Sequence, residues 1–308
     1  MKGRRRTSLI AGTMLVVSLA ASAILLQRID RIRPQATLEE VLYISSPKVL
    51  KRASLGYDGL LADIYWTRAV QYFGNRHASR AAENYNLLAP LLEITTYLDP
   101  HLLVAYQFGG NFLAPAPPNG AGQPDRAIAL LQYGIRNNPN DWHLYYNLGF
   151  VYYTDLKDYA KAADTFAQGS RVPDAHPFVR IMAAQTAEHA GEFETARMLW
   201  KATYATAREK LIRQNAAEHL RDLKVDEDVS MLQSAVTRFG ERTGRLPSSM
   251  QELLAAEGVR GVPVDPDGNP YRLSSDGSIL VANPDDFPFI TLGLPPGYKP
   301  RPPKFHEQ

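Results

Sequence analysis

The chain has 308 residues, with 34 Lys and Arg against 32 Asp and Glu, so its formal net charge is +2. This balance argues against nucleic-acid binding, which depends on clustered positive charge. The sequence contains no cysteine, which excludes disulfides, thiol nucleophiles, zinc–thiolate sites and covalent haem attachment.

The first 27 residues have the composition of a signal-anchor. Lys2, Arg4, Arg5 and Arg6 precede an uncharged stretch, and residues 8–26 would form a helix of roughly 28 Å, close to the thickness of a bilayer core. The basic cluster predicts a cytoplasmic N-terminus. We therefore expect a single-pass anchor in a bacterial cytoplasmic (inner) membrane, with the bulk of the chain on the extracytoplasmic side. Two alternatives stay open: a signal peptide cleaved after Ala23, and a buried soluble helix.

The rest of the chain divides by composition into four segments. Residues 28–57 are mixed and partly polar and are interpreted as a tether. Residues 58–223 have helical periodicity interrupted by short Asn, Pro, Gly and Asp stretches. Residues 224–284 are expected to form a small α+β module that begins with a helix near 226–239. Residues 285–308 are a Pro-rich tail.

Within the helical region, small and large residues recur at fixed intervals. In "NLGFVYYTDLKDYAKAADTF", a glycine in a helix interior costs about 1 kcal/mol relative to Ala, so close packing between helices must offset it. The same spacing returns upstream and downstream, which predicts stacked helix–turn–helix units. The residues expected to pack between the helices of these units are Gly109, Ala127, Gly149, Tyr152, Ala162, Phe166 and Ala196.

These spacings resemble the tetratricopeptide repeat (TPR) family over about residues 58–207. Residues 147–173 match best, with Leu148, Gly149, Tyr152, Ala162, Phe166 and Pro173 near motif positions and one extra residue in the turn. The resemblance implies a mainly α fold: a helical superhelix that follows the transmembrane helix and precedes the small module. It also implies a concave groove, lined by the first helix of each unit, that binds extended or helical protein segments.

The resemblance carries the groove onto particular positions, at which Tyr and Phe dominate. Aromatic side chains are frequent interface anchors. The basic residues with which some members grip a peptide carboxylate are absent, apart from a matching Asn147. The expected groove residues are Leu103, Tyr106, Gln107, His143, Tyr146, Asn147, Phe150, Tyr153, Phe178, Ile181, Gln185 and His189.

The aromatic-rich stretch 54–74 has two interpretations. Its apolar residues cover most of a helix surface, as expected for a buried helix that caps the array. Because it follows the tether, it could also be a docking face for another membrane protein. In both interpretations the apolar surface is formed by Leu60, Leu61, Ile64, Trp66, Ala69, Val70 and Phe73.

The stretch 244–284 resembles the C-terminal part of type II secretion pseudopilins. The resemblance lies in "RLP", a Leu-rich short helix, "DPDGNPY" and a hairpin with Asp276-Gly277 at its turn. The pilin N-terminal features are absent, so the chain is not itself a pilin. Asp265, Asp267 and Asn269 alternate as Ca²⁺ ligands can, or Asp265 caps its own turn. We expect no metal and no cofactor.

Known catalytic motifs are missing from the sequence. There is no Walker loop, dinucleotide glycine pattern, G-x-S-x-G elbow or His-Glu-x-x-His. The acidic residues are expected mostly on helix exteriors, with Glu188-His189 and Glu218-His219 on solvated faces. We therefore expect a scaffold or adaptor for protein partners in a bacterial envelope complex, possibly of a secretion or type IV pilus apparatus. A periplasmic peptide-binding chaperone and a structural subunit are the alternatives; an enzyme is not expected.

Overall fold

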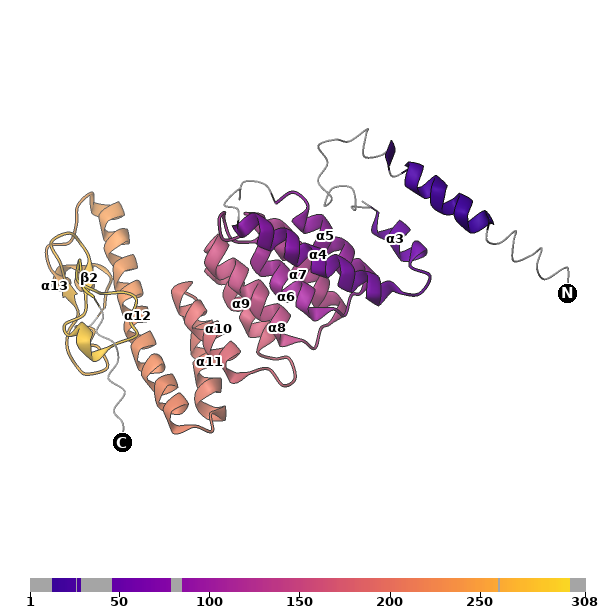
Figure 1. Ribbon diagram of the computed structural model, residues 1–308. Helices are drawn as coiled ribbons and strands as arrows, with labels where there is room; N and C mark the ends of the chain where they lie inside the picture. The colour runs from indigo at the N-terminus through magenta and orange to yellow at the C-terminus, as the bar shows by residue number, and fades with distance from the viewer. Residues whose placement is uncertain (1–12, 26, 29–45, 79–84, 260, 300–308) are drawn as a thin grey trace. The chain divides into compact units, whose positions relative to one another are not determined.

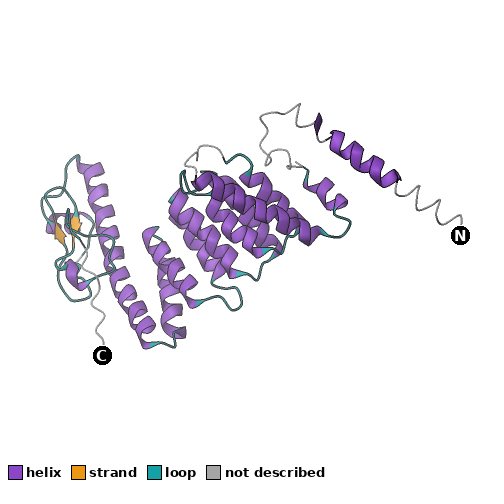
Figure 2. Cartoon of the chain, viewed as in Figure 1, coloured by secondary structure: helices purple, strands orange, loops and turns teal. Residues whose placement is uncertain are grey.

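The computed structural model describes residues 13–25, 27–28, 46–78, 85–259 and 261–299. The chain divides into two units, residues 1–55 and 56–308, which are taken separately below. The fold is mainly helical, as expected, and the strands found among the described residues lie in the C-terminal module (Figure 2).

The first unit contains a helical stretch at 13–25 and α3 (Pro47–Ala53), whose N-terminus is capped by the Ser46 hydroxyl. Large apolar side chains of the first stretch, among them Leu15 and Ile24, are exposed. Within the described residues, no helix has the length and apolarity that crossing a bilayer requires. The expected anchor at 8–26 lies partly outside these residues, as does most of the expected tether.

The second unit begins with helices that pack consecutively along the chain (Figure 1). Each helix contacts the next, and α5 also contacts α7 while α6 contacts α8. The helices are α4 (Asp58–Ala78), α5 (Leu88–Leu98), α6 (Leu103–Leu113), α7 (Pro124–Asn137), α8 (Trp142–Phe150), α9 (Tyr159–Gly169), α10 (Pro177–His189), α11 (Phe193–Thr206) and α12 (Lys210–Thr243).

Local sequence determines where these helices begin and end. Asp141 and Asp158 accept backbone N–H groups at the starts of α8 and α9. Pro124 and Pro177 occupy first-turn positions, where a missing N–H has no cost. Between α8 and α9, the stretch with one residue more than the repeat spacing forms a π-helical turn, η1 (Val151–Leu156).

Helix-to-helix contact at glycine is confirmed as the reason for Gly149. A Cβ added to Gly149 would lie 2.5 Å from Phe166 Cε1. The same holds at Gly109, whose added Cβ would lie 2.7 Å from Leu130 Cδ2. The remaining residues expected to pack in this way are also buried, apart from the half-buried Tyr152: Ala127, Ala162, Phe166 and Ala196.

Helix α4 buries part of the apolar surface that was expected, together with two tyrosines. Ala62, Tyr65, Ala69 and Tyr72 are buried. The expected apolar surface is split, because Leu60, Ile64 and Val70 are exposed. Trp66 and Phe73 nevertheless reach α6, where the Phe73 and Phe112 ring centroids are 4.1 Å apart.

The C-terminal module is built on the second half of α12. It adds α13 (Met250–Ala256), β1 (Arg272–Leu273), β2 (Ile279–Leu280) and η2 (Pro284–Asp286). The two strands pair antiparallel, with Arg272 opposite Leu280, which confirms the expected hairpin. Gly277 N–H donates to Ser274 O at its turn.

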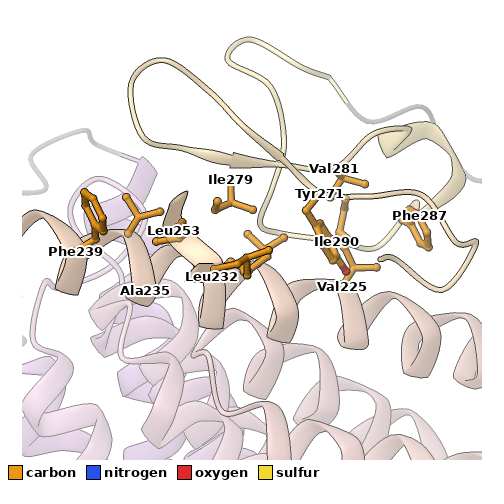
Figure 3. Packing of buried hydrophobic residues seen from close by; sticks show 13 residues of the cluster. Val225, Leu232, Ala235, Phe239, Leu253, Tyr271, Ile279, Val281, Phe287 and Ile290 are labelled. Atoms are coloured by element: carbon orange, nitrogen blue, oxygen red, sulfur yellow. The ribbon is translucent and has the colours of Figure 1, made fainter. Parts of the chain in front are cut away.

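One apolar core joins α12 to the loops above it (Figure 3). The expected helix at 226–239 lies in the second half of a 34-residue helix that begins at Lys210 and belongs to both the array and the module. Phe287 and Ile290 are buried in this core, so the packed module continues past the expected start of the tail. The core residues drawn and labelled are Val225, Leu232, Ala235, Phe239, Leu253, Tyr271, Ile279, Val281, Phe287 and Ile290.

Candidate functional site

A continuous run of aromatic rings follows α8, η1 and the start of α10. The Tyr146 ring centroid lies 4.9 Å from that of Phe150 and 6.4 Å from that of Phe178. Phe150 lies 6.4 Å from Tyr153. We call this run the aromatic strip; its members are Trp142, His143, Tyr146, Phe150, Tyr153, Tyr159, His176, Phe178 and His189.

Packing from below holds the strip in place. Phe166 is fully buried beneath it, with its ring centroid 5.9 Å from Tyr146 and 6.0 Å from Phe150. Gly149 has no side chain, so Phe166 can approach α8 closely and support the Tyr146 and Phe150 rings from below. Partial burial raises the pKa of the Tyr146 phenol.

The N-terminal end of the strip is ordered by the cap of α8. Asp141 Oδ1 accepts the His143 backbone N–H at 2.9 Å and lies 2.9 Å from His143 Nδ1. The His143 ring stacks on Trp142 with centroids 3.7 Å apart. Asn147 donates from Nδ2 to His143 O at 2.9 Å, so this amide is used locally.

The far end of the strip is formed by side chains of three elements. Tyr153 lies 5.3 Å from Tyr159, which lies 5.9 Å from His189. His189 Nδ1 is 3.2 Å from the backbone carbonyl of Gln185. Phe178 has 44% of its surface exposed, and the adjoining Tyr146 and Phe150 are half-buried.

The structure thus brings together six of the expected groove residues: His143, Tyr146, Phe150, Tyr153, Phe178 and His189. Tyr106 is a correction. It is fully buried, its ring abuts Gly134 and its hydroxyl donates to Pro100 O, so it is a core residue and offers a partner no surface. Four other expected groove residues are half-buried and take no part in the ring contacts of the strip. These are Leu103 and Gln107 on α6, and Ile181 and Gln185 on α10.

Three strip members were missed by sequence reasoning. Trp142 and His176 stand at helix starts, where the repeat spacing assigns no groove position. Tyr159 comes from α9, a second helix, whereas the expectation covered first helices. An aromatic next to a helix N-cap was the available signal for Trp142.

The acidic residues include a second correction. Glu188 and His219 were expected on solvated faces, yet both are buried, together with Asp222, Asp226 and Asp228. The expectation was wrong for His219 because the rings of Trp200 and Phe289 stack on its two faces, and wrong for Glu188 because it lies against Trp200 and His219. Across the described residues, no group of three or more His, Asp or Glu side chains is placed to hold a metal ion.

Asp265 caps its own turn, which was the alternative to Ca²⁺ binding. Asp265 Oδ1 accepts the N–H groups of Asp267 at 3.0 Å and Asn269 at 2.9 Å. Asp267 forms an ion pair with Arg221 of α12. The carboxylates are therefore used to cap the turn and to attach it to the helix.

No protein-family model, no curated protein and no solved structure matches the chain. The arrangement of the residues is therefore the basis for assigning a function.

Proposed function

We propose that the chain is a membrane-anchored TPR-like scaffold that holds a protein partner on the aromatic strip. The observation that carries the proposal is the strip itself: partly exposed Tyr and Phe rings in one contiguous run, supported by a rigid core. Such rings bury a large area at low entropic cost and are preferred interface anchors. We place its partner in a bacterial envelope complex.

The TPR-like superhelix is supported by the recurrence of close contacts along the array. Gly109, Gly134, Gly149 and Gly169 each stand within 2.9 Å, measured from an added Cβ, of a side chain on a neighbouring helix. The helices α5, α7 and α9 end two to four residues before a proline. Repeats of this type stack into extended binding surfaces.

The membrane anchor is supported by the sequence of residues 8–26 and by exposed apolar side chains in the helical stretch 13–25. In the proposed topology the N-terminus is cytoplasmic and the array lies on the other side of an inner membrane. The pseudopilin-like module makes secretion or pilus assembly proteins the first partners to test.

Site-specific photocrosslinking tests the scaffold proposal. A photoreactive phenylalanine analogue would replace Phe178 in the full-length protein in cells. A matched control would replace Tyr204 on α11, because these two aromatic residues are 44% and 46% exposed. We expect a discrete crosslinked protein from position 178 and none from 204.

The product pattern separates the alternatives. One or two envelope components in fixed ratio support the scaffold or a structural subunit, and constant stoichiometry in the purified assembly identifies the subunit. Many unrelated exported proteins indicate a chaperone. Equal crosslinking from both positions, or none from either, refutes the strip as the partner site. With the photoreactive residue kept at position 178, replacing Tyr146 and Phe150 by Ala should abolish the captured product with unchanged helical content.

A further inference from the structure

One face of α12 carries a polar stripe between two apolar cores. His219, Asp222 and Asp226 lie at intervals of three and four residues, so they share a helix face. All three are buried. On one side lies the core around Trp200 and Leu223, and on the other lies the module core that begins at Val225.

The two carboxylates hold backbone N–H groups of the C-terminal segment 286–294. Asp222 Oδ2 accepts from Phe289 N at 2.9 Å. Asp226 accepts from Thr291 N at 3.0 Å, from Leu292 N at 2.9 Å and from the Thr291 hydroxyl at 2.8 Å. A segment with little secondary structure thus obtains its hydrogen bonds from a helix more than 60 residues earlier.

His219 connects this segment to the array. Its ring is sandwiched between Trp200 of α11, at 4.0 Å, and Phe289, at 3.9 Å, with both pairs stacked. Glu188 of α10 accepts from Trp200 Nε1 at 2.6 Å, and its second oxygen lies 3.3 Å from His219 Nδ1. Three helices and the segment therefore meet at one imidazole.

Hydrogen-bonding capacity at this meeting point is incomplete. Among the described residues, neither His219 nitrogen has a well-aligned hydrogen-bond partner, and Asp222 Oδ1 has none. All of these atoms are buried, where an unmade hydrogen bond is destabilising. A proton added to the Asp222 carboxyl removes a buried negative charge without removing the oxygen that accepts Phe289 N–H.

The other charged groups around the cluster are engaged with one another. Arg221 pairs with Asp267, donates to Asp286 O and lies over the Phe287 ring, although its charge still lowers the pKa of Asp222. The outer ion pairs are Arg197 with Glu194 and Glu227, and Lys224 with Asp228, which also accepts from Tyr271 OH.

We propose that His219, Asp222 and Asp226 form a proton-sensitive latch that holds segment 286–294 on α12 more tightly in mild acid than at neutral pH. The latch couples the module to the array, because Phe289 is both bonded by Asp222 and stacked on His219. The inference concerns the C-terminal side of the array and goes beyond the proposed partner site.

The sign follows from burial of the carboxylates. Burial raises the pKa of Asp222 from 3.8 to about 6, against smaller opposing effects of the Phe289 N–H, Arg221 and His219. Burial also raises the pKa of Asp226. A carboxyl whose pKa is raised by folding contributes its full stability below the unfolded value of 3.8 and loses it as the pH rises through the folded value of about 6.

Hydrogen–deuterium exchange of the full-length protein in detergent tests the latch. Backbone amides of 286–294 would be compared at pH 5.0 and 7.5 after correction for intrinsic exchange rates. The pKa of Asp222 is about 6 while the segment is bound and 3.8 once the segment has opened. We therefore expect about tenfold greater protection at pH 5.0 than at pH 7.5. Amides of α8, which lie outside the cluster, should keep the same protection and serve as the internal reference.

Two variants separate the latch from a general pH effect. Asp222→Asn keeps an acceptor for Phe289 N–H but cannot ionise, so protection at pH 7.5 should reach the wild-type value at pH 5.0. Asp276→Asn in the exposed hairpin turn should leave the wild-type pH dependence intact. Equal wild-type protection at both pH values overturns the proposal, even where Asp222→Asn fails to fold. Persistence of the tenfold change in a folded Asp222→Asn also overturns it.

Discussion

Replacing Gly149 by Ala tests whether helix contact explains this glycine. The new methyl group would lie 2.5 Å from Phe166 Cε1, 2.6 Å from Cδ1 and 2.9 Å from Cζ. Phe166 is fully buried and bounded by the Tyr146 and Phe150 rings, so it has little room to withdraw. Three contacts of this kind with a rigid ring require a shift of α8, α9 or both.

The magnitude follows from two opposing effects. Overpacking of a well-filled core costs typically 1–3 kcal/mol, and the depth of this overlap places it toward the upper end, at about 2–3 kcal/mol. Ala is preferred over Gly in a helix by about 1 kcal/mol. We therefore expect Gly149→Ala to lower the free energy of unfolding by about 1–2 kcal/mol, although the substitution favours the helix.

A matched control isolates the contact from helix propensity. Gly74 lies inside α4, and an added Cβ there meets nothing within 4 Å. Gly74→Ala should therefore stabilise the protein by up to about 1 kcal/mol. Urea denaturation followed by circular dichroism measures both, and the two variants should differ in sign.

A double-mutant cycle completes the test. In Gly149→Ala/Phe166→Leu, the smaller Leu side chain replaces the ring that the new methyl group meets. This double variant should recover part of the stability lost in Gly149→Ala, with a coupling energy of about 1 kcal/mol between the two sites. If Gly149→Ala stabilises the chain as much as Gly74→Ala does, the close approach of Gly149 to Phe166 is not what this position requires.

Three further substitutions probe the buried polar groups and the module core. Asp226→Ala should destabilise the fold by about 2 kcal/mol, because the N–H groups of Thr291 and Leu292 lose their acceptor. In urea denaturation, the stability of Asp226→Asn should lie between those of Asp226→Ala and wild type. An Asp226→Ala variant as stable as wild type would contradict the contact. Trp200→Phe should lower the free energy of unfolding by about 1–3 kcal/mol, because it removes the donor to Glu188. The control Trp66→Phe, at a partly exposed position, should lower it less. Equal melting temperatures of the two variants would refute the role of the Trp200–Glu188 hydrogen bond. Leu253→Ala should lower the free energy of unfolding by about 2–5 kcal/mol, because Leu253 is fully buried. Leu211 is 62% exposed, so Leu211→Ala should change it by no more than about 0.5 kcal/mol. Similar shifts of the calorimetric melting temperature for both variants would show that Leu253 is not in a packed core.

The helical array shows which features could be predicted from sequence. The 3.6-residue period and its Asn, Pro, Gly and Asp interruptions are local signals, and they predicted a helical region from Asp58 onward, which the structure shows. The glycine spacing also predicted inter-helix contact, since a glycine inside a helix requires a packing reason. The position of Tyr106 was misjudged because period alone does not tell the face toward a groove from the face toward the next helix.

The strip was predicted in part for the same reason. Positions on first helices were carried over from the TPR resemblance, and the structure places the rings of Tyr146, Phe150 and Phe178 beside one another. Tyr159 joins them from a second helix, because α9 packs against η1 and brings Tyr159 to the ring of Tyr153. Side chains that meet from different elements leave no interval in the sequence by which to find them.

By itself, the sequence determined the local features of this protein: an apolar basic-flanked N-terminal stretch, stacked helices with small residues at their contacts, and a hairpin at Asp276-Gly277. Tertiary structure decided the fate of the charged residues on α12. Asp222 and Asp226 belong to a strongly charged helix and resemble solvated residues until segment 286–294 covers them. Burial of a charge depends on what packs over it, and here the covering chain comes from more than 60 residues away, beyond the reach of any local pattern.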